Sequence, residues 1–271
     1  MSEHTFPPPL DRSYPVLDGK IVTRSLEAHV VDHCNLTCAE CCSLSPHLPA
    51  WQVEPAALAR DLAHATRILA PRVFKLVGGE PLLHPQLVEL VEIVRTSRIA
   101  PRISITTNGL LLERMPDALW EAIDALTISL YPRPALSTAS RAAIEARAGQ
   151  FDVALNWKQQ DEFVVMNRSE PTSDADDTRR IFDDCWIRER CHMLRSGRFY
   201  TCTRPPHFGA YHRIDFTGDG VALDSLDTAA LHAYLTSDRP LAACAHCLGG
   251  SGATMVPHRL LTRDELVRLR R

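Results

Sequence analysis

The sequence predicts an α/β protein in which a parallel sheet of about six strands curls into a partial barrel and carries a small C-terminal module. Short apolar, β-branched runs alternate with segments of helical periodicity over residues 21–168. Polar or glycine-containing loops recur where these strands end. From residue 169 the pattern changes to acidic, then cysteine- and proline-rich sequence, which marks the module.

The first predicted strand is rich in β-branched residues and ends at a cysteine loop, and the second closes on two glycines. The strands are expected at residues 21–32, 73–77, 102–106, 125–130, 151–156 and 162–166. Apolar residues at helical spacing predict helices at residues 55–69, 85–94, 115–123 and 136–148. No clear helix separates the last two strands. A short helix is expected over 262–271, where terminal arginines complement the helix dipole.

These elements divide the chain into an N-terminal arm (1–20), a partial barrel (21–168), and an auxiliary module with a C-terminal helix (169–271). Residues 178–250 contain too few core positions to fold unaided, which is typical of modules that need a bound metal. Active sites of parallel α/β sheets lie at the carboxyl ends of the strands. The cysteine loop and three other polar loops are all predicted to lie there.

Composition excludes several function classes. The 271 residues have a formal net charge of −3, so no overall attraction to nucleic acid is expected. The N-terminus lacks a secretory signal, and no apolar run approaches the ~18 residues of a membrane helix, so we expect a cytoplasmic protein without membrane contact. In a reducing compartment nine cysteines indicate metal or redox chemistry rather than disulfides.

The first cysteine group has the pattern Cys34-x3-Cys38-x2-Cys41. Thiolates suit iron-sulfur clusters, and three ligands from one loop leave the fourth iron of a cubane open for a small molecule. A structural zinc site, completed by Cys42 or His33, is the alternative, because such sites ordinarily close with four protein ligands.

With the loop CNLTCAEC and the tetrapeptide Gly78-Gly79-Glu80-Pro81 after the second strand, the chain resembles the radical S-adenosylmethionine (SAM) superfamily. That resemblance implies a partial (β/α)6 TIM-like barrel, a catalytic [4Fe-4S] cluster on the three cysteines, and SAM cleaved to a 5′-deoxyadenosyl radical. It implies that residues 78–81 contact the methionyl amino group. Thr107, Asn108 and Ser129, at later strand ends, are expected near the SAM carboxylate or ribose. Glu40 stands where relatives commonly carry an aromatic residue near the adenine.

The later cysteines resemble the auxiliary module called twitch and its longer relative SPASM, because Gly197 precedes Cys202 by the spacing of their signature. The implied ligands of a second [4Fe-4S] cluster are Cys185, Cys202, Cys244 and Cys247. Zinc is the alternative for these four thiolates. Cys191 is left over, and is a candidate hydrogen-atom donor to a substrate radical or a replacement for Cys185. Cys42 is a weaker donor candidate.

The resemblance therefore predicts a radical SAM oxidoreductase or epimerase. Its substrate is expected to be a small polar metabolite such as a sugar, an aminocyclitol or a nucleotide-linked sugar. An electron donor such as flavodoxin or ferredoxin is the implied partner. Two alternatives stay open: a maturase that modifies a ribosomal peptide, and a non-catalytic iron-sulfur or zinc module, against which residues 78–81 argue.

Overall fold

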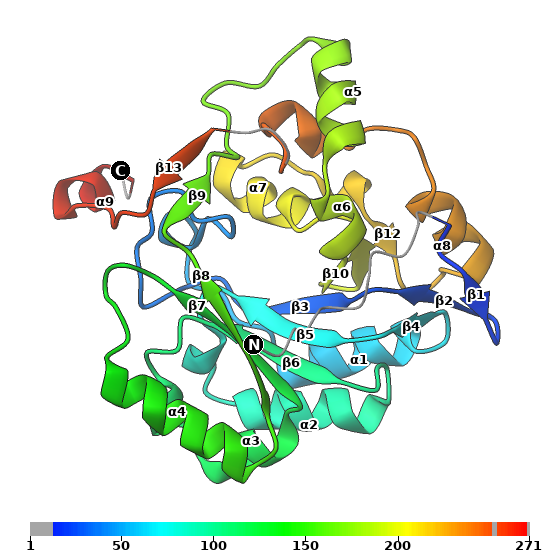
Figure 1. Cartoon of the computed structure of the whole chain (residues 1–271). Helices are drawn as coiled ribbons and strands as arrows, with labels where there is room; N and C mark the ends of the chain where they lie inside the picture. The colour runs from blue at the N-terminus through cyan, green and yellow to red at the C-terminus, as the bar shows by residue number, and fades with distance from the viewer. Residues whose placement is uncertain (1–12, 251–253, 270–271) are drawn as a thin grey trace.

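The computed structural model describes residues 13–250 and 254–269, so residues 1–12 of the predicted arm lie outside the described residues. Its centre is an eight-stranded sheet (Figure 1). Six adjacent strands run parallel, and two more, each antiparallel to its neighbour, extend one edge. In spatial order the strands are β12 (Val221–Ala222), β11 (Arg198–Tyr200), β10 (Met193–Arg195), β3 (Leu26–Val31), β5 (Phe74–Gly78), β6 (Ile103–Thr107), β7 (Ala125–Leu130) and β8 (Ala154–Gln159).

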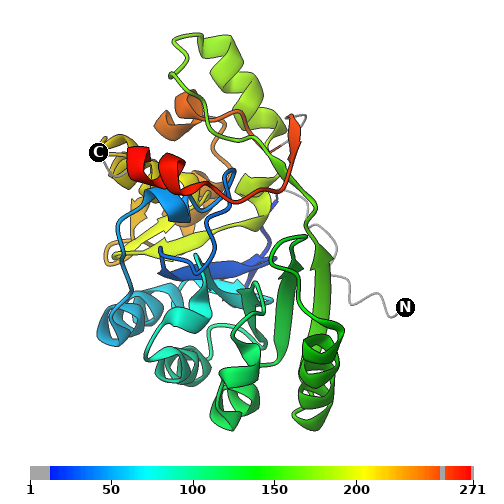
Figure 2. The same ribbon diagram turned by 90° about the vertical axis from the view of Figure 1, so that its left-hand side faces the viewer.

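Four helices cover one face of the curved sheet, as both views show (Figures 1 and 2): α1 (Pro55–Ala65), α2 (Leu87–Ser97), α3 (Asp117–Ala122) and α4 (Thr138–Gln150). Alternate strand residues such as Leu26, Leu76 and Ile105 point into this interface and are fully buried. The apolar stripes of α1 and α2 pack against them. The predicted α/β fold with a parallel sheet is confirmed.

The first predicted strand, 21–32, is divided in two. β2 (Lys20–Thr23) lies between β1 (Val16–Leu17) and β4 (Leu69–Pro71) in a separate three-stranded sheet, and β3 begins at Leu26. The break is stabilised at Ser25, whose hydroxyl donates to Arg190 O over 2.7 Å. Apolar content alone did not reveal the break between β2 and β3, because the residues on both sides of it form strands.

The predicted sixth barrel strand, 162–166, is wrong. β9 (Glu162–Val164) pairs antiparallel with β13 (Met255–Pro257), outside the main sheet. β10 instead supplies the sixth parallel strand, beside β3 at the opposite edge. The fifth predicted strand, 151–156, is shifted, because the Phe151 N–H still bonds to Arg147 O at the end of α4 and Asp152 has a φ of 54°.

The remaining helices lie above the sheet (Figure 1): α5 (Ala175–Asp184), α6 (Ile187–Arg190), α7 (Arg204–His212), α8 (Thr228–Leu235) and α9 (Arg263–Leu269). A second hydrophobic cluster, which includes Met166, Ile187 and Phe208, holds much of this part together. The main sheet includes β10–β12, which follow residue 168 in the chain. The boundary between a partial barrel and an auxiliary module at this residue therefore stays a prediction. Within the described residues, we find no helix whose length and apolar character would allow it to cross a bilayer.

Candidate functional site

The cysteine loop follows β3, and the neighbouring strand ends are those of β5, β6 and β7. Because parallel neighbours end at one edge of the sheet, these loops meet. Asn108, directly after β6, reaches the cysteine loop: its Nδ2 donates to Asn35 Oδ1 over 2.7 Å and lies 3.9 Å from Cys34 Sγ. The structure thus brings the predicted cysteines together with residues 78–81, Thr107 and Asn108.

The three loop thiols are close enough for their charges to repel. Burial raises the pKa of Cys34 and of Cys38 to about 12, and repulsion from Cys41 adds to both shifts. Burial also raises the pKa of Cys41. Thiols in such surroundings ionise when a bound cation compensates their charge. Three soft donors on one loop therefore fit the irons of a cubane.

Gly78 and Gly79 allow the chain after β5 to pass against the start of the cysteine loop. A Cβ on Gly78 would lie 2.2 Å from Val31 O, and one on Gly79 would lie 2.1 Å from His33 O. No side chain fits at these distances. Gly79 N donates to Val31 O over 2.8 Å, so the glycines bring this turn directly onto the loop.

Glu80 is fully buried, and both of its carboxylate oxygens accept hydrogen bonds from the protein. Oε1 accepts from Thr107 Oγ1 over 2.7 Å and from Leu82 N over 3.1 Å, while Oε2 accepts from Asn108 N over 2.8 Å. Burial raises the pKa of Glu80, and these bonds oppose the shift. Glu80 therefore fixes the end of β6, on which Asn108 is carried.

Three stacked rings lie beside the loop, and sequence reasoning missed them. Tyr131, just after β7, lies 5.9 Å from Phe163 of β9 and 4.9 Å from His258 between ring centroids. His258 Nε2 lies 3.2 Å from Cys38 Sγ. Tyr131 could have been found, since it follows the predicted site residue Ser129 by two positions. His258 could not, because 220 residues separate it from Cys38.

The second predicted ligand set also meets in space. Cys185, Cys202, Cys244 and Cys247 line one cavity, and its other walls come from α5, α6 and apolar residues such as Leu241 and Ala243. Burial and repulsion from Cys185 raise the pKa of Cys202 well above its usual value. Cys191 is not among the described residues that line this cavity.

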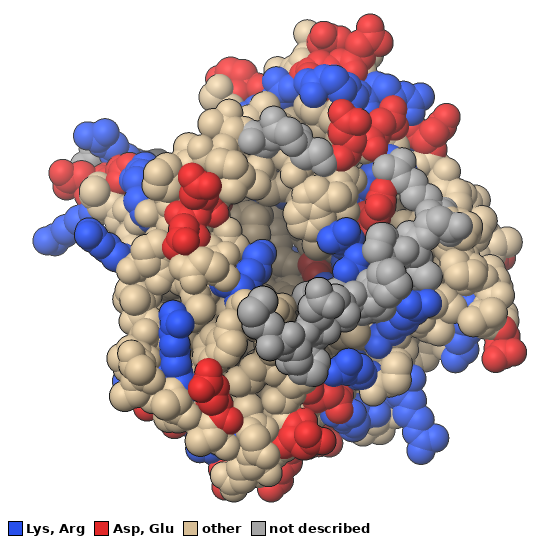
Figure 3. Space-filling view, viewed as in Figure 1, with Lys and Arg blue, Asp and Glu red and all other residues tan. Residues whose placement is uncertain are grey.

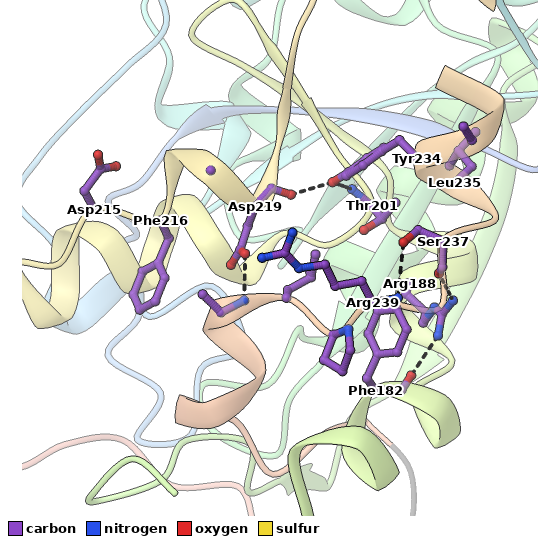
Figure 4. A pocket seen from close by; sticks show the side chains of 15 residues that line it. Phe182, Arg188, Thr201, Asp215, Phe216, Asp219, Tyr234, Leu235, Ser237 and Arg239 are labelled. Carbon is purple, nitrogen blue, oxygen red and sulfur yellow. Dashed lines mark hydrogen bonds between the residues drawn. The ribbon is translucent and has the colours of Figure 1, made fainter. Parts of the chain in front are cut away.

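A larger cavity of about 540 Å³ adjoins this one and shares Phe182, Arg188 and Leu241 with it (Figure 4). The polar groups that line this larger cavity form hydrogen bonds with its own wall segments. Asp219 accepts from Ala242 N and Ala243 N through its carboxylate, and its carbonyl accepts from Tyr234 Oη over 2.5 Å. This network anchors the 3-10 helix Ala242–His246, which carries Cys244.

The sheet face away from α1–α4 is polar. Glu27 and Lys75 are neighbours in register, as are Lys75 and Ser104. Half-buried Cys191 lies near Glu27, because the next residue, His192, accepts a hydrogen bond from Glu27 N over 2.8 Å. Figure 3 shows the molecule hollowed near its centre, above the sheet and below α6 and α7, with charged side chains at the margin. We call this polar face of the sheet the inner face. Its residues are Glu27, His29, Lys75, Ser104, Thr106, Thr127, Ser129 and Asn156.

Sequence reasoning also missed the inner face, although a signal existed. Polar residues alternate with apolar ones through β3, whereas strands of parallel sheets are ordinarily apolar on both faces. Arg204 donates to Cys42 O and to Asn167 Oδ1, each over 2.6 Å, so its guanidinium is bonded within the protein. In the part of the chain that the structure describes, no three His, Cys, Asp or Glu side chains are grouped around a single-ion site.

Comparisons with known proteins bear on the family and on the fold. Residues 29–131 match the Radical SAM superfamily. GTP 3′,8-cyclase of Chlorobaculum tepidum is 36% identical over 102 residues, which are 37% of this chain and 31% of that protein. The Mycobacterium marinum GTP 3′,8-cyclase is 39% identical over 122 residues, 43% of this chain and 34% of that protein. The chain thus spans about a third of the length of these curated relatives.

Among solved structures, BtrN in complex with AdoMet and 2-DOIA is similar in fold. The TM-score is 0.57 at 16% sequence identity, and the match covers 87% of this chain and 96% of BtrN. At this identity the likeness concerns the fold alone.

Proposed function

We propose that this chain is an enzyme that cleaves SAM reductively and removes a hydrogen atom from a small polar metabolite. The match of residues 29–131 to the Radical SAM superfamily supports this proposal. Oxidation or epimerisation of a sugar, an aminocyclitol or a nucleotide-linked sugar is the outcome that fits best. The polar inner face carries the proposal. Its charged and hydroxyl side chains lie on the sheet that ends at the cysteine loop and favour a polar substrate over an apolar one.

Cys34, Cys38 and Cys41 are the proposed ligands of the catalytic [4Fe-4S] cluster, with one iron left for SAM. When bound, the cluster and SAM supply the electron and the carbon radical, with reducing equivalents from a donor such as flavodoxin or ferredoxin. The chain contributes ligands, orientation and a site shielded from water. Leu36 N donates to Cys34 Sγ over 3.3 Å and helps to fix that ligand.

We assign two kinds of role to the predicted SAM contacts. The Asn108 amide and the Ser129 hydroxyl are proposed to bind SAM directly, as is the backbone of Gly78, Gly79 and Pro81. Glu80 and Thr107 bond to each other inside the protein. These two are proposed to position Asn108 and the glycine turn.

A second [4Fe-4S] cluster is proposed in the cavity that Cys185, Cys202, Cys244 and Cys247 line. Four thiolates would ligate it fully and suit it for electron transfer. Zinc is the competing occupant, since four thiolates also suit zinc. Metal analysis distinguishes them: two clusters give about eight irons per chain, whereas zinc at this site gives about four irons and one zinc.

The first experiment is anaerobic reconstitution followed by an assay for 5′-deoxyadenosine after reduction. The wild type is expected to form it, and the triple variant Cys34→Ala, Cys38→Ala, Cys41→Ala is not. The matched control is Cys42→Ala, which alters the adjacent exposed thiol. Product formation by the triple variant, or none by the wild type with any reductant, contradicts the proposal.

A substrate panel then tests the metabolite class. Sugars, aminocyclitols and nucleotide-linked sugars are offered together with GTP and short peptides, and turnover in D2O separates the outcomes. Epimerisation with Cys191 as donor incorporates deuterium into the product and stops in Cys191→Ala, whereas oxidation does neither. Glu27→Gln and Lys75→Met are expected to raise KM for the substrate at least tenfold and to leave substrate-free SAM cleavage unchanged. If the enzyme turns over only GTP, or only a peptide, that compound replaces the proposed substrate class.

A further inference from the structure

Residues 255–261, here called the strap, pair with β9 on one side and with the cysteine loop on the other. β13 forms the first half of the strap and pairs with β9. The second half pairs with the loop: Ala39 N donates to Arg259 O over 3.0 Å, and Leu261 N donates to Thr37 O over 2.8 Å. Backbone bonds therefore fix the strap on both sides.

His258 lies between these two sets of bonds, and four contacts fix its position. Its backbone N–H donates to Asp161 O over 2.7 Å. Its ring stacks on Tyr131 at an interplanar angle of 25° and lies 5.3 Å from the Phe163 ring. The remaining contact is the 3.2 Å approach of Nε2 to Cys38 Sγ. The stacking therefore holds the plane of the ring beside the sulfur.

We infer that His258 donates a hydrogen bond from Nε2 to the Cys38 thiolate and thereby raises the reduction potential of the catalytic cluster. The inference rests on the proposed ligand role of Cys38. Reduction adds negative charge to a cluster and its sulfurs, so a donor to a ligand sulfur stabilises the reduced form more than the oxidised form. His258 is then a positioning and tuning residue, which does not itself touch the substrate.

The test compares two variants that separate the donor from the ring. His258→Phe keeps a ring against Tyr131 and Phe163 and removes the N–H, whereas His258→Gln keeps an N–H near the same place and removes the ring. The readout is the midpoint potential from an EPR-monitored titration, with the catalytic cluster identified by its spectral response to SAM. In His258→Phe the ratio of reduced to oxidised cluster at a fixed potential is expected to fall roughly three- to tenfold. His258→Gln is expected to stay near the wild type.

The matched control is His64→Phe, a histidine on α1 that bonds to Arg67 and should leave the potential unchanged. Equal potentials in wild type and His258→Phe overturn the inference, as does an equal shift in the Phe and Gln variants. If His258→Phe takes up no iron, His258→Met against His258→Gln provides the same comparison of side chains without and with a donor. Failure of the ligand assignment looks different, because the triple cysteine variant would then retain the SAM-responsive signal.

Discussion

At the scale of single residues, Glu80 has no free carboxylate oxygen, since three donors within the protein use both. Glu80→Gln replaces one acceptor by an NH2 group that faces another donor. We expect a loss of about 2–3 kcal/mol in the free energy of unfolding, because a buried donor is left unsatisfied, together with weaker SAM binding. Urea unfolding and calorimetric titration with SAM measure the two effects.

Glu89→Gln on α2 is the control for Glu80, since the Glu89 side chain is exposed and bonds only to Gln86 in the described structure. It should change neither quantity. Unaltered SAM affinity in a destabilised Glu80→Gln would show that the carboxylate supports the fold without orienting Asn108.

His207 of α7 is completely buried, 3.7 Å from Asp32 Oδ1 and 4.6 Å from the His29 ring. Burial lowers the pKa of His207 to about 3, although Asp32 opposes this shift. The unfolded chain binds a proton near pH 6.5 and the folded chain does not, so stability is present above pH 6.5 and is lost as pH falls toward 3. From pH 7 to pH 5 the wild type should lose about 2 kcal/mol more than His207→Phe.

Urea unfolding of the metal-free protein at several pH values measures this difference, because acid releases iron from thiolate ligands. His212→Phe serves as the comparison on the same helix, since that ring is less buried. If wild type and His207→Phe lose stability in parallel with pH, His207 is protonated in the fold.

Motifs located individual residues, whereas the contacts between their side chains came from the structure. The sequence placed Glu80 and Thr107 at the site, and the structure brings both beside the cysteine loop. Side-chain direction, which no motif encodes, has them bonded to each other, and their expected contacts with SAM stay a prediction. His258 carries no sequence signal at all, because its proximity to Cys38 depends on the strap.

At the scale of elements, the turn after β5 depends on the absence of a side chain at Gly79. In Gly79→Ala the new Cβ would meet His33 O at 2.1 Å and force the turn away from the cysteine loop. We expect a loss of about 3 kcal/mol or more in stability and little iron uptake. Iron analysis after reconstitution and thermal unfolding are the measurements.

Gly149→Ala is the matched control, because this glycine lies in α4 with nothing within 4 Å of its added Cβ. It should stabilise the protein by about 0.5–1 kcal/mol. Normal iron uptake in Gly79→Ala would mean that the loop takes its final form without this close contact.

Elements with long periodic patterns were predicted well, and short ones were not. α1, α2 and β7 lie where their apolar spacing predicts them. β10 has only three residues, and its place beside β3 is set by contacts across more than 160 positions of sequence. Local patterns hold no information on such pairing, so β9 was predicted as the sixth parallel strand and β10 was not.

At the scale of the whole molecule, the predicted barrel region is incomplete by itself. β10 covers the edge of β3, and Leu194 and Phe199 of the later segment are buried in the main core. A fragment of residues 1–168 would expose this edge and these contacts. We expect it to aggregate or to lack cooperative unfolding, whereas the full chain unfolds cooperatively; circular dichroism and size-exclusion chromatography decide. A folded, monomeric fragment would contradict this.

The pairing of the strap with the cysteine loop also orders events during synthesis. The loop leaves the ribosome before the strap does, because its backbone partners at Arg259 and Leu261 are made some 220 residues later. Until then Cys38 has neither its neighbouring strand nor the imidazole beside it. Iron delivered before the strap is made would meet three thiols on an unsupported loop, so cofactor loading belongs after the strap has paired with the cysteine loop.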